Sequence, residues 1–472
     1  MFRPMKPNTD KFRVAFVSGK LGDVDGVSLE VDKWISALGE LGHEVYTVAG
    51  RYASPLRTIP SENQLTLDPI RFDGDEQREY ERQVFPHLSG RLPQLTVAAR
   101  QSIMESIEER GADVAHELYE LIRSLDIDVL IAENTNAMPM TLLGGMAVHR
   151  VATEMRLATI FHHHDFWWER SRFSDNQIRG LLDRIMPPAD LGLEHVVISS
   201  YAAHILTSIK RVVPHVIPNC EDFDNPVGLD DYNRRLRSEL GFADNDLLVV
   251  QPTRIVPRKK LEDSVRLLGR LLVRYPEYRD RLRYVVSLYQ GDEPNANYIE
   301  QIRELADELG VDLRLISDRV ASQRGSDQAG RPLFTNRDVL ANADLVTYLP
   351  IWEGFGNALL ESMAARVPVV TTTYLVYKTD IKVTGIRNIE IRDRYDETGA
   401  LVVTDDVVDY IHWTLTHRDE ARERIDRDFQ IANREFGIGV LRERISHLFG
   451  VYGDEIRASR QRLAKSKVNY SV

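Results

Sequence analysis

The chain has 472 residues, of which 43% are hydrophobic and 28% are charged. This balance matches that of ordinary globular proteins and excludes a largely disordered chain. With 60 basic and 72 acidic residues the formal net charge is −12, which disfavours nonspecific binding to nucleic acid. The one cysteine, Cys220, excludes an internal disulfide and a cysteine-based zinc site.

Hydropathy along the chain bears on where the protein works. No run of about 18 apolar residues occurs, so we expect no membrane-spanning helix. Residues 1–11 lack the apolar core of a secretory signal. We therefore expect a cytoplasmic protein that does not associate with membranes.

Short apolar runs alternate with amphipathic stretches along the chain, a pattern typical of parallel strands joined by helices. Residues 12–18 predict a strand, residues 19–26 a glycine-punctuated loop, and residues 31–41 repeat apolar side chains at helical spacing. Gly42 then ends the predicted helix. Further strands of this half are predicted at 44–49, 129–132, 158–161 and 195–199.

A proline-rich segment at 214–226 marks a boundary, after which the same pattern restarts. The polar stretch 318–336 predicts a long loop, and residues 405–465 are rich in helix-like, charged sequence. Strands of the second half are predicted at 247–251, 284–288, 313–316, 345–348 and 367–371. The sequence thus predicts an α/β fold with two consecutive doubly wound parallel-sheet domains.

The strongest chemical signal lies between residues 348 and 365. Glu353 follows a predicted strand, the glycine-rich turn 354–356 comes next, and a helix that begins near Asn357 carries Glu361. Ligands of open α/β sheets bind at the carboxyl ends of strands, and glycines at a helix N-terminus let backbone N–H groups approach an anion. A glycine-loosened turn with two solvated glutamates is the alternative that stays open.

A second signal follows the first strand of the second half. Arg254 and Lys259 lie five residues apart beyond that strand. Two cations at the carboxyl end of a strand suit a diphosphate, because arginine offers a bidentate fork and lysine a point charge. The alternative is an ordinary solvated basic turn.

Together, Arg254, Lys259, Glu353 and Glu361 resemble the donor-binding half of retaining glycosyltransferase family 4, which has the GT-B fold. Further matches lie at Gly22 and Gly26, at 42–45, 217–219 and 342–344. The resemblance implies two Rossmann-like domains that face a cleft. We expect an N-terminal acceptor-side domain at 1–217, joined by a C-terminal helix at about 440–472, and a C-terminal nucleotide-sugar donor domain at 218–439.

The resemblance also implies roles for these residues. Arg254 and Lys259 would contact the donor diphosphate, Glu353 the donor sugar and Glu361 the nucleotide ribose. The donor site would include Gly354, Phe355, Gly356 and Asn357, with no metal and no tightly bound cofactor. The turn at 287–292 departs from the compact glycine turn of the family, and the 318–336 segment falls where the base would lie, so the base stays open.

Residues 159–170 carry three consecutive histidines followed by Asp165. Because side chains alternate along a strand, at most two of the three histidines converge, and a metal site or a packed strand end are both open alternatives. Family members place a His, often followed by Asp, beside the donor sugar. The resemblance therefore implies a catalytic role for His164, with Asp165 orienting its imidazole, and His163 is the alternative if the register differs.

Two first-half loops supply acceptor-side candidates. Glu133 and Asn134 follow a predicted strand and could hydrogen-bond acceptor hydroxyls, or could equally cap a helix. The early glycine loop adds Asp25, Gly26 and Ser28, since the family uses this loop near the acceptor and the donor phosphate.

We therefore expect a metal-independent, retaining hexosyltransferase. It would move a hexose from a nucleotide diphosphate sugar of the UDP-glucose or GDP-mannose type to a hydroxyl of a small acceptor, such as a sugar or sugar acid. Other GT-B enzymes, a nucleotide-sugar epimerase or a disaccharide phosphorylase, remain alternatives. An NAD-dependent dehydrogenase is a further one, although no GxGxxG follows the first strand.

Overall fold

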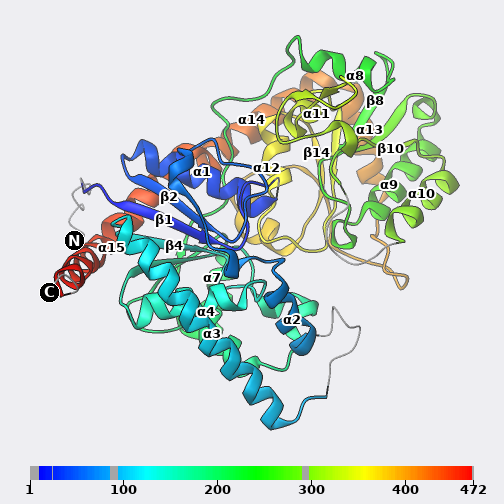
Figure 1. Cartoon of the computed structure of the whole chain (residues 1–472). Coiled ribbons are helices and arrows are strands. Elements are labelled where there is room, and N and C mark those ends of the chain that lie inside the picture. Colours follow the sequence, from blue (N-terminus) through cyan, green and yellow to red (C-terminus); the bar gives the residue numbers. More distant parts are fainter. Residues whose placement is uncertain (1–9, 24, 86–93, 290–296, 470–472) are drawn as a thin grey trace. The chain divides into compact units, whose positions relative to one another are not determined.

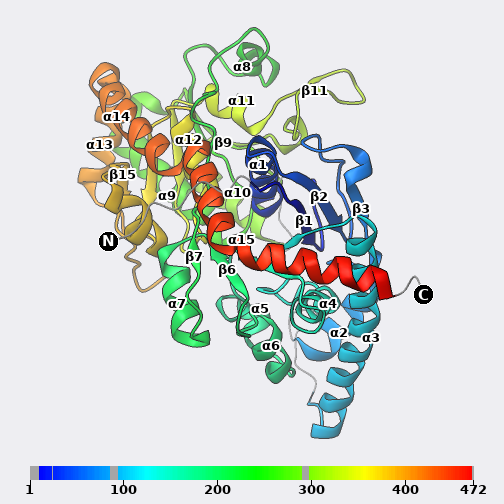
Figure 2. The same cartoon turned by 90° about the vertical axis from the view of Figure 1, so that its left-hand side faces the viewer.

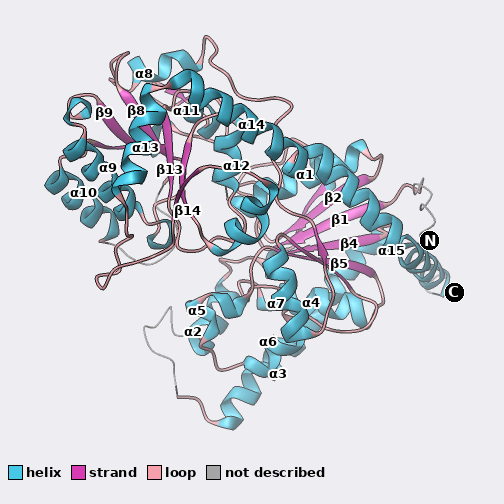
Figure 3. Cartoon of the chain, turned by 180° about the vertical axis from the view of Figure 1, so that it is seen from behind, coloured by secondary structure: helices cyan, strands magenta, loops and turns pink. Residues whose placement is uncertain are grey.

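The computed structural model describes residues 10–23, 25–85, 94–289 and 297–469 (Figure 1). It divides into two compact units, Met1–Pro218 with Leu441–Val472, and Asn219–Val440. Each unit is an α/β domain built on its own parallel sheet, with helices on both faces of the strands (Figure 3). The predicted fold class is confirmed.

The first unit contains a seven-stranded sheet in the order β3-β2-β1-β4-β5-β6-β7. Every pairing within it is parallel. The strands are β1 (Arg13–Ser18), β2 (Glu44–Ala49), β3 (Gln64–Thr66), β4 (Val129–Glu133), β5 (Ala158–His163), β6 (Glu194–Val197) and β7 (His215–Val216). The helices are α1 (Gly26–Glu40), α2 (Asp75–Val84), α3 (Val97–Ser124), α4 (Leu142–Thr153), α5 (Ser171–Ser174), α6 (Arg179–Ile185) and α7 (Ser200–Lys210).

The second unit contains a six-stranded sheet in the order β10-β9-β8-β13-β14-β15. Its strands are β8 (Leu247–Gln251), β9 (Leu282–Val286), β10 (Leu313–Leu315), β13 (Leu345–Tyr348), β14 (Val369–Thr372) and β15 (Ile389–Ile391). Its helices are α8 (Leu236–Glu239), α9 (Leu261–Arg274), α10 (Tyr298–Leu309), α11 (Asn336–Ala341), α12 (Asn357–Ala364), α13 (Asp405–Thr416) and α14 (Arg418–Phe436). The helix α15 spans Ile438–Asn469, and its residues from Leu441 onward belong to the first unit.

Burial explains why short apolar runs become strands here. All residues of β4 (VLIAE) and β8 (LLVVQ) are buried, as expected for strands covered by helices on both faces. Along α9 the buried residues recur at helical spacing and pack into the core of the second unit. The central strands of both sheets therefore gain most of their stability from apolar burial.

The polar stretch 318–336 is more ordered than the predicted loop. It holds a short antiparallel hairpin of β11 (Gly325–Ser326) and β12 (Pro332–Leu333), which Tyr232 ties down by donating to backbone carbonyls of both strands. Residues 290–292 of the turn predicted to depart from the family pattern lie outside the described residues. Within the described ranges, none of the helices has the length and apolar character needed to cross a membrane.

Helix α15 lies along the amino ends of the first unit's strands (Figure 2). The backbone N–H of Ala158 donates to Ser459 Oγ at 2.9 Å, and that of Thr159 donates to the Tyr452 hydroxyl at 3.2 Å. Arg460 forms a bidentate ion pair with Asp128 just before β4. The helix thus satisfies polar groups where two central strands begin, leaving their carboxyl ends on the opposite edge.

Replacing Ser459 with alanine should destabilise the first unit. The buried N–H of Ala158 would lose its acceptor, which costs about 1–3 kcal/mol of unfolding free energy. Amide hydrogen exchange at Ala158 should accelerate accordingly, and calorimetry should show a lower melting temperature. Ser208 is exposed on α7, so Ser208→Ala is the matched control and should leave both measurements unchanged. Equal effects of the two substitutions would contradict this role of α15.

Candidate functional site

In the second unit, charged residues gather where two neighbouring strands end. Strand β8 pairs with β13, so the segments that follow them meet at one edge of the sheet. Arg254 and the short turn Pro257–Lys259 follow β8, whereas Glu353 follows β13. The Lys259 ammonium forms an ion pair with Glu353 Oε1, and Arg258 Nη1 donates to the same oxygen at 2.8 Å. One buried carboxylate therefore holds two cations.

This arrangement changes the basicity of Lys259. Burial lowers its pKa to about 8, and the charges of Arg258 and Arg254 act in the same direction against the attraction of Glu353. The ammonium also lies 5.3 Å from the centre of the Tyr348 ring. Because burial and the neighbouring cations destabilise the charged form of Lys259, an approaching anion stabilises it.

The glycine turn at 354–356 needs glycine at its last position. Gly356 has a φ of +132°, and a Cβ there would lie 2.4 Å from the Tyr374 hydroxyl. That hydroxyl donates to the carbonyl of Phe355 at 2.7 Å, and the Phe355 ring is 2% exposed and packs against Phe436. Phe355 thus anchors the turn in the core, and the first backbone amides of α12 follow directly.

The remaining predicted donor residues lie on α12. Asn357, its first residue, accepts a hydrogen bond from Asn219 at 2.6 Å. Glu361 accepts a hydrogen bond from Asn336 at 2.9 Å, and Asn336 accepts one from Ser287 at 2.6 Å. Asn336 and Ser287 were not predicted as site residues. Nothing in the sequence pattern marks Asn336, since it ends a polar segment without a motif.

In the first unit, Glu133 and two of the three histidines form a buried cluster. Glu133 Oε2 lies 3.0 Å from His162 Nδ1, and Glu133 Oε1 lies 2.5 Å from His164 Nε2. Glu133 ends β4 and pairs in register with His162 on the neighbouring β5. As the alternation along a strand predicts, His163 points to the other face, where its Nε2 lies 3.0 Å from Nδ1 of His195.

Asp165 does not orient the His164 ring as the sequence suggested. In the described part of the chain the ring nitrogen is hydrogen-bonded by Glu133, while the Asp165 carboxylate accepts from Arg170 Nε at 2.8 Å. Asn134 links the two residues: its Oδ1 accepts from the backbone N–H of His164 at 3.2 Å, and its Nδ2 contacts Asp165 at 3.4 Å. The predicted His–Asp contact is thus replaced by two separate pairs.

The early glycine loop is tied up in helix capping. Asp25 is the N-cap of α1 and accepts hydrogen bonds from the backbone N–H groups of Val27 and Ser28 at 3.1 and 3.0 Å. The Ser28 hydroxyl also donates to Asp25, and Lys20 forms an ion pair with it at 3.2 Å. Gly26 is the first residue of the helix. These contacts are local, and they assign the Asp25 carboxylate and the Ser28 hydroxyl to the cap of α1.

Glu133, His162 and His164 are also the one group of possible metal ligands found among the described residues, with ligand atoms within 4.8 Å of one another. Imidazole nitrogens and a carboxylate oxygen are a chemically suitable set for zinc or manganese. In the structure these atoms are hydrogen-bonded to each other. A metal ion would therefore have to displace the two hydrogen bonds that link the Glu133 carboxylate to the imidazoles of His162 and His164.

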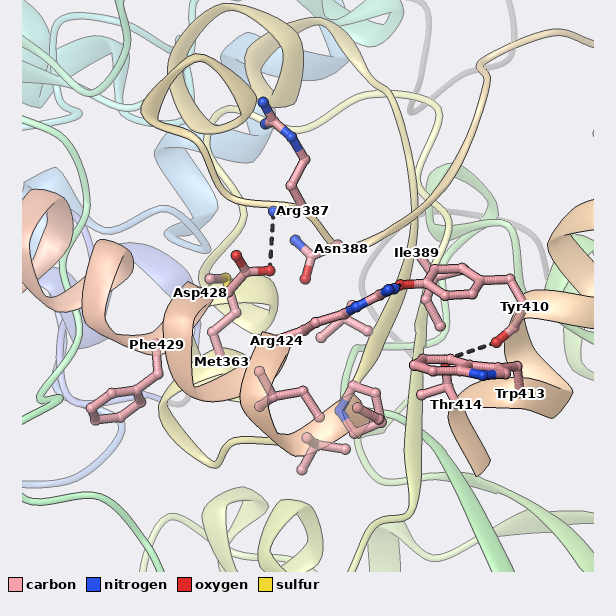
Figure 4. A pocket seen from close by; sticks show the side chains of 15 residues that line it. Met363, Arg387, Asn388, Ile389, Tyr410, Trp413, Thr414, Arg424, Asp428 and Phe429 are labelled. Atoms are coloured by element: carbon pink, nitrogen blue, oxygen red, sulfur yellow. Dashed lines mark hydrogen bonds between the residues drawn. The ribbon is translucent and has the colours of Figure 1, made fainter. Parts of the chain in front are cut away.

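A pocket elsewhere in the second unit does not belong to these clusters (Figure 4). Its cavity volume is only about 40 Å³, and it lies where β14 and β15 begin, lined by Ile389, Trp413 and Asp428 among others. The Arg424 guanidinium lies 4.7 Å from the Trp413 ring. Because Arg254 and Glu353 follow the opposite ends of their strands, this pocket is remote from the predicted donor site within the unit.

Two Rossmann-like parallel-sheet units, the second with a carboxylate–cation cluster and a glycine turn at its strand ends, are the architecture of glycosyltransferases of the GT-B fold. The family model of the group 1 glycosyl transferases matches residues 328–426. Mannosylglucosylglycerate synthase of Thermotoga maritima is 30% identical over 450 residues, covering 92% of this chain and 99% of that protein. The chain belongs to the same glycosyltransferase family as this synthase.

Other relatives agree with this assignment. Mannosylglucosylglycerate synthase of Petrotoga mobilis is 29% identical over 396 residues, covering 80% of this chain and 86% of that protein. Among solved structures, Anabaena Alr3699/HepE in complex with UDP and glucose aligns with a TM-score of 0.59 at 13% identity, over 93% of this chain and 99% of that one. Sucrose-phosphate synthase of Thermosynechococcus elongatus aligns with a TM-score of 0.61 at 12% identity, over 93% and 98%. These structures share the fold.

Glu169 gives the folding stability of the first unit a measurable pH dependence. Burial raises the pKa of its carboxyl to about 7, with a smaller contribution from the Asp165 charge against the hydrogen bond from Phe166 N–H. The folded state therefore favours the protonated carboxyl. The stabilisation is full below the ordinary pKa of a glutamate and is lost as the pH rises to about 7.

Glu169→Gln should remove this pH dependence. The variant should match the wild type at pH near 4.5 and be more stable above pH about 7, by about 1–3 kcal/mol, because glutamine never ionises. Melting temperatures at the two pH values measure the difference. Glu62 is exposed, so Glu62→Gln serves as control and should follow the wild type at both. A stability difference that is equal at both pH values would contradict the raised pKa.

Proposed function

We propose that this glycosyltransferase is a retaining hexosyltransferase that takes its sugar from a nucleotide diphosphate sugar and needs no metal ion for transfer. The hexose moves to a hydroxyl of a small acceptor, such as a sugar or sugar acid. The observation that carries the proposal is the cluster of Lys259, Arg258 and Glu353 beside Arg254, at the carboxyl ends of β8 and β13.

The chemistry of the leaving group supports this proposal. Breaking the bond to the anomeric carbon leaves charge on the diphosphate, and fixed cations that stabilise this charge lower the barrier. Arg254 and Lys259 would supply two cations, and the amides of Gly354, Gly356 and Asn357 would add donors at the start of α12. The diphosphate would replace Glu353 as the partner of Lys259 and free that carboxylate for the hydroxyls of the donor sugar.

The other residues take roles around this centre. Glu361, already hydrogen-bonded to Asn336, would accept from the hydroxyls of the nucleotide ribose. His164 would contact a hydroxyl of the donor sugar. Asp165 would support this contact indirectly, through its hydrogen bonds with Asn134 and Arg170. Retention of the anomeric configuration is proposed on the resemblance to family 4, since its members retain it.

The relatives favour a mannosyl donor of the GDP-mannose type and a carboxylated acceptor. Both are mannosylglucosylglycerate synthases, whose product carries a mannosyl group, a glucosyl group and glycerate. A sugar acid that already bears the glucosyl group is the acceptor that such a product requires. UDP-glucose is the competing donor.

The test is a donor and acceptor panel. GDP-mannose, UDP-glucose and ADP-glucose are each incubated with glucosylglycerate, glycerate and neutral disaccharides, with and without EDTA, and products are identified by NMR. We expect an α-linked mannosyl product from GDP-mannose and glucosylglycerate, formed equally well in EDTA. A β-linked product would overturn retention, and a changed nucleotide sugar without acceptor would identify an epimerase instead.

Arg254→Ala and Lys259→Ala should each lower kcat/KM, by the equivalent of roughly 2–4 kcal/mol of transition-state stabilisation, because each removes a cation that would contact the leaving group. Lys259→Arg keeps a positive charge at this position. In the wild type, affinity for a nucleoside diphosphate should fall as the pH rises past about 8, since Lys259 then loses its proton, whereas Lys259→Arg should show no such fall. Titration calorimetry at pH 7 and 9 measures this. Wild-type kinetics in either alanine variant would contradict the clamp.

The two glutamates should separate in their kinetic effects. Glu353→Gln should lower kcat at least about tenfold while nucleoside diphosphate affinity changes little, because a contact to the donor sugar matters in the transition state. Glu361→Gln should mainly raise the dissociation constant of the nucleotide, through weaker ribose hydrogen bonds. Equal nucleotide affinity in the two variants would show that these roles are assigned wrongly.

A further inference from the structure

We propose that Glu133 is a positioning residue that fixes the ring of His164 toward its substrate, with His162 as the second support of the same carboxylate. The proposal rests on the proposed function, because it concerns the transfer step in which His164 takes part. It assigns Glu133 a role different from the acceptor contact that the sequence suggested.

Burial excludes Glu133 from direct contact with an acceptor. Its side chain is 1% exposed, and each of its carboxylate oxygens meets one imidazole nitrogen. A buried carboxylate is costly unless it is paired and hydrogen-bonded, and two imidazoles provide both conditions.

A carboxylate determines which nitrogen of each imidazole carries a proton. An ionised carboxylate only accepts hydrogen bonds, so His164 Nε2 and His162 Nδ1 must both be protonated. The Nδ1 atom of His164 is then the ring nitrogen available to a substrate.

The second imidazole has no other visible task. His162 is 1% exposed, and its ring centre lies 4.7 Å from that of Trp34. Its outer nitrogen, Nε2, has no hydrogen-bond partner among the described residues. His162 is thus held by packing on one side and by Glu133 on the other. It keeps the carboxylate in the orientation that His164 requires.

The backbone supports the same geometry. Asn134, directly after Glu133, has a φ of +55°, a conformation that few residues other than glycine adopt. From this position its Oδ1 accepts from the backbone N–H of His164 at 3.2 Å. Glu133 therefore fixes the ring of His164, and Asn134 fixes its backbone.

The test compares Glu133→Gln with the wild type. The amide presents one acceptor and one donor, so it cannot accept from both imidazoles. We expect kcat to fall about tenfold or more, with the nucleoside diphosphate dissociation constant and the donor KM within about twofold. His195→Phe is the control for loss of a buried hydrogen bond between two histidines, that of His195 with His163, and should lower the melting temperature without changing kcat.

Two further measurements keep the proposal falsifiable. His162→Phe is the second variant, for the case that Glu133→Gln does not fold. It keeps a ring against Trp34 but removes the hydrogen bond from His162 to Glu133, and it should lower kcat several-fold. Nitrogen NMR of ¹⁵N-histidine-labelled enzyme, without substrate, should show a protonated Nε2 on His164. Unchanged kcat in a folded Glu133 or His162 variant, or an unprotonated Nε2, would overturn the proposal.

A metal site is the competing outcome of the same experiments. If EDTA abolishes wild-type turnover, manganese or zinc chloride restores it, and Glu133→Gln no longer binds that ion, the three side chains are metal ligands and the proposal is wrong. Failure of the wild type to transfer any hexose would instead refute the proposed function, while the NMR readout of His164 would still decide the role of Glu133.

Discussion

The parallel pairing of adjacent strands is the constraint on which both clusters depend. In a parallel pair the carboxyl ends lie at the same edge, so residues that follow the strands become neighbours although the sequence separates them. Pairing of β4 with β5 brings Glu133 beside His162 and His164 across 29 to 31 positions. Pairing of β8 with β13 brings Lys259 to Glu353 across nearly a hundred. Without this pairing neither carboxylate could be buried.

Both clusters use the same electrostatic arrangement, in which one buried carboxylate serves two basic groups. Glu353 holds Arg258 and Lys259, whereas Glu133 holds two imidazoles. The consequences differ because the bases differ. Burial and two neighbouring guanidinium groups lower the pKa of Lys259. The pKa of His164 is raised instead, because its main charged neighbour, Glu133, is an anion. The cluster of the second unit thus carries more positive than negative charge, and that of the first unit carries a polarised imidazole.

The strands could be predicted from sequence because they are buried on both faces. The runs at 44–49, 247–251 and 345–348 match β2, β8 and β13 residue for residue. The prediction missed β3, β7 and β15, which have three, two and three residues and are too short for a pattern. It also missed the β11–β12 hairpin, which Tyr232 stabilises from a distant position in the chain.

The chemical groups were recognisable as residue types, but their partners were not. Alternation along β5 correctly separated His163 from its neighbours. It could not show that Glu133 would hydrogen-bond the imidazole of His164 or that Arg170 would hydrogen-bond Asp165, because both contacts depend on side-chain packing around two loops. The link of Asn336 to Glu361 likewise depends on where α11 begins.

The placement of α15 has a consequence for the order in which the protein forms during synthesis. The second unit is continuous, so all its residues have been synthesised once Val440 is added. The first unit needs Tyr452, Ser459 and Arg460 to satisfy the beginnings of β4 and β5, and these residues are made after the entire second unit. The domain that is translated first is therefore completed last, and its central strands keep unsatisfied backbone groups until the final helix arrives.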